Sequence, residues 1–216
     1  MLERVIQETD ENPQQAIIWL HGLGADGNDF VPVIPLLGLR RPTRLIFPHA
    51  PIQPVTVNGG MAMRAWYDIY EMTLERKIDQ AGIEASAAEV IELIQEQRAQ
   101  GIALEQIFLV GFSQGGAVAL HVLARYPNQL AGVLALSTYS PDLDQALTHS
   151  GSVETPLAIH HGVQDAVVPE SLGQRTRDRF DQLGFAPSYR TWPMAHSVLP
   201  EQLTEIGQWI HQQTGG

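Results

Sequence analysis

Cysteine is absent from this 216-residue chain, so no disulfide bond can crosslink the fold. A chain of this length buries about 70% of its unfolded surface and needs no such crosslink to be stable. Long apolar runs are also lacking, because no stretch approaches the roughly 20 residues of a membrane span. The amino terminus has no basic stretch followed by an apolar core, as a secretory signal would. These absences predict a cytoplasmic protein without integral membrane association.

Basic residues are scarce: 13 Lys and Arg stand against 24 Asp and Glu, for a formal net charge of -11. Such a balance argues against nucleic acid or an anionic membrane as the partner.

No repeat, low-complexity block or linker divides the chain, and strand and helix signals alternate throughout. The pattern predicts one α/β domain over residues 1–216, with a mostly parallel twisted sheet flanked by helices.

The most informative stretch is residues 107–127, where a buried apolar strand (107–110) enters Gly111-Phe112-Ser113-Gln114-Gly115 and then an Ala- and Val-rich helix. Strand, G-x-S-x-G turn and helix are typical of a nucleophile elbow. Side chains at 111 and 115 would collide with the crossing backbone, and glycine removes both collisions. The alternative is a Gly-rich connection without chemistry. We interpret Ser113 as a nucleophile placed at a helix N-terminus, which favours negative charge.

A second Gly-rich loop, residues 21–30, follows the buried strand at 16–20. It could approach a phosphate, but the G-x-x-x-x-G-K-[ST] pattern is absent. The pattern favours an oxyanion hole built from the Leu23 N–H together with the N–H of Gln114. His21 is interpreted as a structural residue that holds this loop, and His49 as a structural residue in a later turn.

Two further residues follow later strands. Asp165 comes after the strand at 157–162, and His196 lies in the loop after the last strand. The order Ser113, Asp165, His196 is that of the α/β-hydrolase triad. His196 would move the proton of Ser113, and Asp165 would fix the imidazole tautomer. Asp142 and Asp144 are the rival acids.

No metal or cofactor is expected, because the neighbouring His160 and His161 alternate faces of a strand and no other ligand stands at suitable spacing.

Residues 52–82 lack clean periodicity and carry aromatic and methionine side chains. We predict a long irregular insertion that is either a satellite of the core or the apolar wall of an acyl pocket. Met63, Trp66 and Val168 are the candidate pocket residues. Ser86-Ala87-Ala88-Glu89 has the pattern of a capping box and predicts the start of a helix that ends at Gly101.

Five motifs stand out along the chain: HGLGADGNDF (21–30), AWYD (65–68), GFSQGGAVAL (111–120), HGVQDAVVP (161–169) and AHSV (195–198). Together they resemble the phospholipase/carboxylesterase family of α/β-hydrolases, which includes acyl-protein thioesterases and small carboxylesterases. The resemblance covers essentially the whole chain and implies a compact hydrolase with no large lid domain, acting on esters or thioesters with short to medium acyl chains. Relatives include homodimers, so a homodimer is left open. Tyr67 stands where some members carry Phe.

The sequence therefore favours a serine carboxylesterase that forms an acyl-enzyme on Ser113. The alternatives are an acyl-protein thioesterase or a lysophospholipase, and a non-catalytic binding protein on the same fold.

Overall fold

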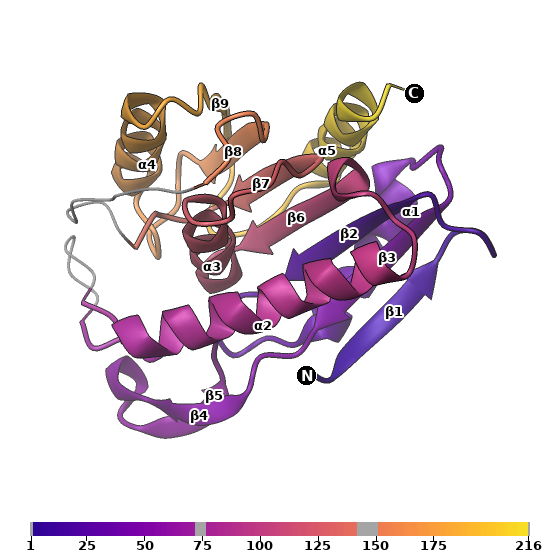
Figure 1. Ribbon diagram of the computed structural model, residues 1–216. Helices are drawn as coiled ribbons and strands as arrows, with labels where there is room; N and C mark the ends of the chain where they lie inside the picture. Colours follow the sequence, from indigo (N-terminus) through magenta and orange to yellow (C-terminus); the bar gives the residue numbers. More distant parts are fainter. Residues whose placement is uncertain (1, 72–76, 142–150, 216) are drawn as a thin grey trace.

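The computed structural model describes residues 2–71, 77–141 and 151–215 (Figure 1). Its centre is a seven-stranded sheet in the order β1-β3-β2-β6-β7-β8-β9. β1 pairs antiparallel with β3, and every other pair in this sheet is parallel, which confirms the predicted α/β class. The strands are β1 Arg4–Glu8, β2 Gln15–Leu20, β3 Thr43–Pro48, β6 Ile107–Phe112, β7 Gly132–Leu136, β8 Leu157–Gly162 and β9 Ser188–Trp192.

Helices cover both faces of the sheet, as Figure 1 shows. α2 and α3 pack together on one face, whereas α1 and α5 pack together on the other. The central strands are buried on both sides, and β2 alternates between the two cores, with Ile18 in the first and Trp19 in the second. The helices are α1 Ile34–Leu37, α2 Gln80–Ala99, α3 Gln114–Leu123, α4 Glu170–Gln182 and α5 Pro200–Gln213; short 3₁₀ helices are η1 Gly27–Val33, η2 Thr56–Asn58 and η3 Leu104–Gln106.

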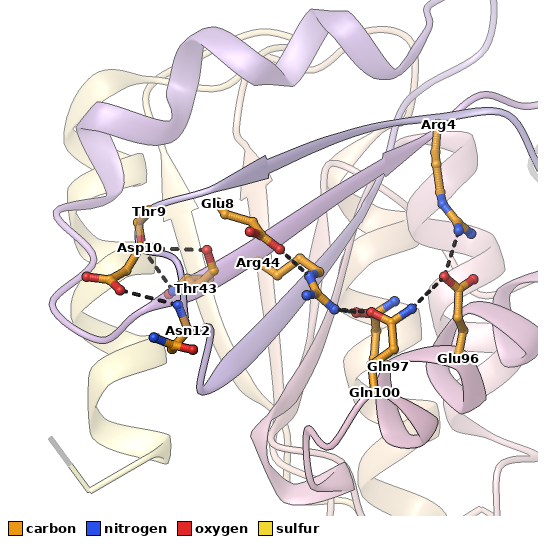
Figure 2. A network of polar contacts seen from close by, with 10 residues as sticks. All are labelled: Arg4, Glu8, Thr9, Asp10, Asn12, Thr43, Arg44, Glu96, Gln97 and Gln100. Atoms are coloured by element: carbon orange, nitrogen blue, oxygen red, sulfur yellow. Dashed lines mark hydrogen bonds and ion pairs between the residues drawn. The ribbon is translucent and has the colours of Figure 1, made fainter.

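The antiparallel edge strand β1 is tied to the end of α2 by a polar network (Figure 2). Arg4 forms an ion pair with Glu96 at 2.7 Å, and Arg44 on β3 forms one with Glu8 at 2.6 Å. The Arg44 guanidinium also donates to the side chains of Gln97 and Gln100. These contacts hold an edge strand whose outer side has no strand partner among the described residues.

Within the predicted insertion, residues 52–71 and 77–82 are described, and they are more regular than their sequence pattern indicated. β4 (Ile52–Val55) and β5 (Met61–Arg64) form an antiparallel hairpin around η2, and Ile69 pairs with Ile78. The predicted capping box is also wrong, because α2 begins at Gln80 after Asp79, and Ser86 lies inside the helix. The Ser86 hydroxyl donates to the carbonyl of Trp66 instead, a contact between residues that are distant in sequence.

Candidate active site

Ser113 joins β6 to α3 at a turn whose backbone is strained. It has φ 53° and ψ -118°, a conformation that residues with a side chain rarely adopt. A Cβ on Gly111 would lie 2.3 Å from the Gly115 carbonyl oxygen, and a Cβ on Gly115 would lie 2.6 Å from that of His21. Any side chain at position 111 or 115 would therefore collide with backbone atoms, as the G-x-S-x-G pattern predicts.

His196 lies between the two other predicted residues. Its Nε2 is 2.9 Å from Ser113 Oγ, and its Nδ1 is 2.7 Å from Asp165 Oδ2. The three side chains come from loops at the carboxyl ends of β6, β8 and β9, so the parallel sheet delivers them to one edge. The Asp165 side chain is fully buried, whereas that of His196 is 17% exposed and can meet a substrate.

The two oxygens of the Asp165 carboxylate have different partners. Oδ1 accepts the backbone N–H groups of Val167 and Val168 at 2.9 and 2.8 Å, which leaves Oδ2 for His196. Burial acts to raise the pKa of Asp165, but the hydrogen bonds from His196 and the two backbone N–H groups outweigh it and lower that pKa. Asp165 is therefore a carboxylate that can stabilise a positive imidazolium.

A second histidine, His161, lies next to the same carboxylate. Its Nε2 is 3.7 Å from Asp165 Oδ2 and 2.8 Å from the carbonyl oxygen of Val168, to which it donates. Burial lowers the pKa of His161, so this ring stays neutral at neutral pH. The negative charge of Asp165 is consequently not neutralised by a second imidazolium.

The loop after β2 lies against the elbow. A Cβ added to Gly22 would be 3.5 Å from the Cβ of Ser113. The buried His21 ring accepts the N–H of Ala50 at Nε2, so its proton is on Nδ1, which donates to the carbonyl of Gly22 at 2.7 Å. Burial lowers the pKa of His21, which keeps this tautomer neutral. The structural interpretation of His21 is thus confirmed, and His49 likewise accepts the N–H of Gly27.

A cavity of about 600 Å³ opens at Ser113 and His196. Of the three predicted pocket residues only Val168 lines it, so the predictions for Trp66 and Met63 are wrong. Trp66 is buried with its polar groups bonded to the protein, and Met63 packs its sulfur beside Asn58 at 3.2 Å. The lining is mostly apolar: Gly22, Leu23, Ala25, Asp29, Phe30, Val33, Val57, Asn58, Tyr67, Ile69, Phe112, Ser113, Gln114, Tyr139, Val167, Val168, His196, Ser197 and Val198.

Most of these lining residues were missed by sequence reasoning, since they come from six separate regions of the chain. For Tyr67 the sequence did carry a signal, because this residue stands in the AWYD motif. In the structure Tyr67 and Tyr139 both line the cavity, and their hydroxyl oxygens lie 3.2 Å apart.

The predicted rival acids Asp142 and Asp144 lie outside the described residues. Within residues 2–71, 77–141 and 151–215, no group of three or more His, Cys, Asp or Glu side chains is arranged to hold a metal ion.

Comparison with known proteins settles the family. The family model described as Phospholipase/Carboxylesterase matches residues 2–214. The chain belongs to the phospholipase/carboxylesterase family. An acyl-protein thioesterase 1 of Neurospora crassa is 36% identical over 213 residues, covering 91% of this chain and 86% of that protein. An acyl-protein thioesterase 1 of Saccharomyces cerevisiae is 34% identical over 208 residues, covering 91% of this chain and 92% of that protein.

A solved structure agrees with this assignment. The crystal structure of Zea mays acyl-protein thioesterase 2 superposes with a TM-score of 0.86 at 26% identity, covering 99% of each chain. The chain is therefore a hydrolase with the α/β-hydrolase fold of the phospholipase/carboxylesterase family. None of the helices in the described ranges is both long and apolar enough to cross a membrane.

Proposed function

We propose that this member of the family is a serine esterase that hydrolyses carboxylic esters or thioesters through an acyl-enzyme on Ser113. The observation that carries the proposal is the position of His196, hydrogen-bonded between Ser113 Oγ at 2.9 Å and Asp165 Oδ2 at 2.7 Å in the wall of an apolar cavity. A volume of about 600 Å³ lies within the range of about 300–1,000 Å³ usual for small-molecule sites.

The proposed reaction begins when Ser113 Oγ attacks the carbonyl carbon and its proton passes to His196 Nε2. Asp165 Oδ2 stabilises the imidazolium through Nδ1–H. The imidazolium then donates its proton to the departing alkoxide or thiolate, and the acyl group stays on Ser113. Water, deprotonated by the same imidazole, attacks the acyl-enzyme and releases the acid.

The developing oxyanion is assigned to the N–H groups of Leu23 and Gln114. Gln114 is the first residue of α3, so its N–H has no acceptor within the helix. The Gly22–Leu23 peptide is trans, so its N–H points away from its C=O, which the His21 ring holds. Each such donor typically lowers the barrier by about 3 kcal/mol.

The test is turnover of p-nitrophenyl esters from acetyl to lauroyl by wild type and by Ser113→Ala. We expect hydrolysis by wild type and its loss in Ser113→Ala, with Ser188→Ala, a substitution of a serine on the edge strand β9, as the matched control. A folded wild-type protein that binds these esters without turning them over would support the binding-protein alternative instead.

The relatives named acyl-protein thioesterase support a second candidate within the same chemistry, hydrolysis of S-acylated proteins. Comparison of kcat/KM for matched oxyesters and thioesters of one acyl chain, including an S-acylated peptide, separates the two. A lysophospholipase would instead release fatty acid from lysophosphatidylcholine faster than from either. A cytoplasmic location and a homodimer stay predictions.

A further inference from the structure

Trp66 is buried, with 1% of its surface exposed, yet it takes no part in the cavity wall. Its indole N–H donates to the carbonyl oxygen of His21 at 2.8 Å. His21 immediately precedes the Gly22–Leu23 peptide, whose N–H is one of the two donors assigned to the oxyanion. The indole therefore holds the loop one peptide before that donor.

The position of Trp66 is itself set by the residue that carries the other donor. The Gln114 side chain accepts the backbone N–H of Trp66 at 2.9 Å through Oε1, and its Nε2 donates to the carbonyl of Tyr67 at 2.8 Å. The Ser86 hydroxyl donates to the carbonyl of Trp66. With both backbone groups bonded, Trp66 has little freedom to move relative to α3.

A continuous set of contacts thus joins the two proposed donors. It runs from the Gln114 side chain to the Trp66 backbone, from the indole to the His21 carbonyl, and from the His21 ring to the Gly22 carbonyl. The far side of the loop is held by the Gly24 N–H, which donates to the Arg64 carbonyl at 2.8 Å. The indole bond is the link in this set that spans the gap between the 66–67 segment and the loop after β2.

We propose that Trp66 is a positioning residue: its indole N–H holds the backbone N–H groups of Leu23 and Gln114 at the relative positions needed to bind the oxyanion. This inference rests on the proposed function. Without the N–H, the buried His21 carbonyl loses its partner, and the adjoining peptides can rotate. The amides would then stabilise the transition state less well, because the oxyanion forms there, whereas binding of the ground-state ester would change much less.

The experiment compares Trp66→Phe with Trp19→Phe. Trp19 is 0% exposed and its indole nitrogen has no hydrogen-bond partner among the described residues, so both substitutions remove one buried indole but only the first removes a bond. We expect Trp66→Phe to lower kcat for a short-chain p-nitrophenyl ester by about 10- to 100-fold, somewhat less than removal of a whole donor, with KM within about twofold. Trp19→Phe should stay within about threefold of wild type in both constants.

A second readout measures the oxyanion directly. A trifluoromethyl ketone accepts Ser113 Oγ at its carbonyl carbon and places the resulting oxyanion against the two amides. Its inhibition constant should rise with the loss of kcat in Trp66→Phe and not in Trp19→Phe. If Trp66→Phe does not fold, β-(3-benzothienyl)alanine at position 66 keeps the ring volume without the N–H and should show the same selective loss of kcat.

Equal effects of the two phenylalanine variants, or a benzothienylalanine enzyme with wild-type kcat, would overturn the role of Trp66. So would a change confined to KM. The proposed function is tested separately, since it fails only if the wild type does not turn over esters or if Ser113→Ala retains turnover.

Discussion

Substitution of Asp165 by Asn is the sharpest test that Asp165 is the acid of the proposed triad, because backbone N–H groups fix the orientation of the new side-chain amide. Oδ1 of Asp165 accepts two N–H groups, from Val167 and Val168. An Asn carbonyl oxygen can keep both bonds, whereas the NH₂ group would place its own hydrogens against them. The amide oxygen of the substituted side chain therefore takes the place of Oδ1, and its NH₂ takes the place of Oδ2 and faces His196 Nδ1.

This orientation of the amide forces the His196 imidazole into the opposite tautomer. Nδ1 must accept from the amide, so the proton moves to Nε2, which then donates to Ser113 Oγ and cannot take its proton. The wrong tautomer costs about 10⁴-fold in kcat, about 5.5 kcal/mol at about 1.4 kcal/mol per factor of ten. Folding should persist, since the two backbone bonds survive.

The assay is kcat and KM for a p-nitrophenyl ester at neutral pH, with thermal unfolding to verify folding. Asp178→Asn is the matched control, because that carboxylate is exposed on α4 and pairs only with a neighbouring arginine in the contacts described for it. Retention of kcat within about tenfold in Asp165→Asn, together with a crippled Asp142→Asn, would refute the assignment of the acid.

Three other predictions follow from the same geometry. Gly115→Ala should destabilise the protein by at least about 2 kcal/mol in urea unfolding, because its Cβ would lie 2.6 Å from the His21 carbonyl; an unchanged midpoint would contradict this close approach. Because hydrogen bonds lower the pKa of Asp165, its contribution to stability is present above the ordinary Asp pKa of about 4 and is lost as pH falls through the lower folded value. The stability gap between wild type and Asp165→Asn should therefore narrow below about pH 4, and a gap independent of pH would argue against the shift. Val57→Phe adds bulk to the cavity lining and should lower kcat/KM for lauroyl more than for acetyl esters by about tenfold; equal losses would place Val57 away from the acyl chain.

Local sequence patterns were sufficient to predict those strands that are buried on both faces of the sheet. A strand buried on both faces, such as β6, reads as an apolar run wherever it lies in the sheet. The G-x-S-x-G pattern marks the elbow, and the collision that requires Gly111 is local, since it is with the Gly115 carbonyl; the collision that requires Gly115 is with the distant His21 carbonyl, which only the fold brings close. The start of α2 was misjudged because Ser86 resembles a cap, but its hydroxyl is used by Trp66, twenty positions away.

The sequence by itself determined the sheet strands, the strained serine and the order of the residues proposed for catalysis, since each depends on neighbours along the chain. Only the tertiary structure decided which side chains line the cavity and which lie behind it. Trp66 and Tyr67 are adjacent, yet Tyr67 faces the cavity while Trp66 reaches the His21 carbonyl. The direction of a side chain in an irregular segment is set by distant partners, and no local periodicity encodes those partners.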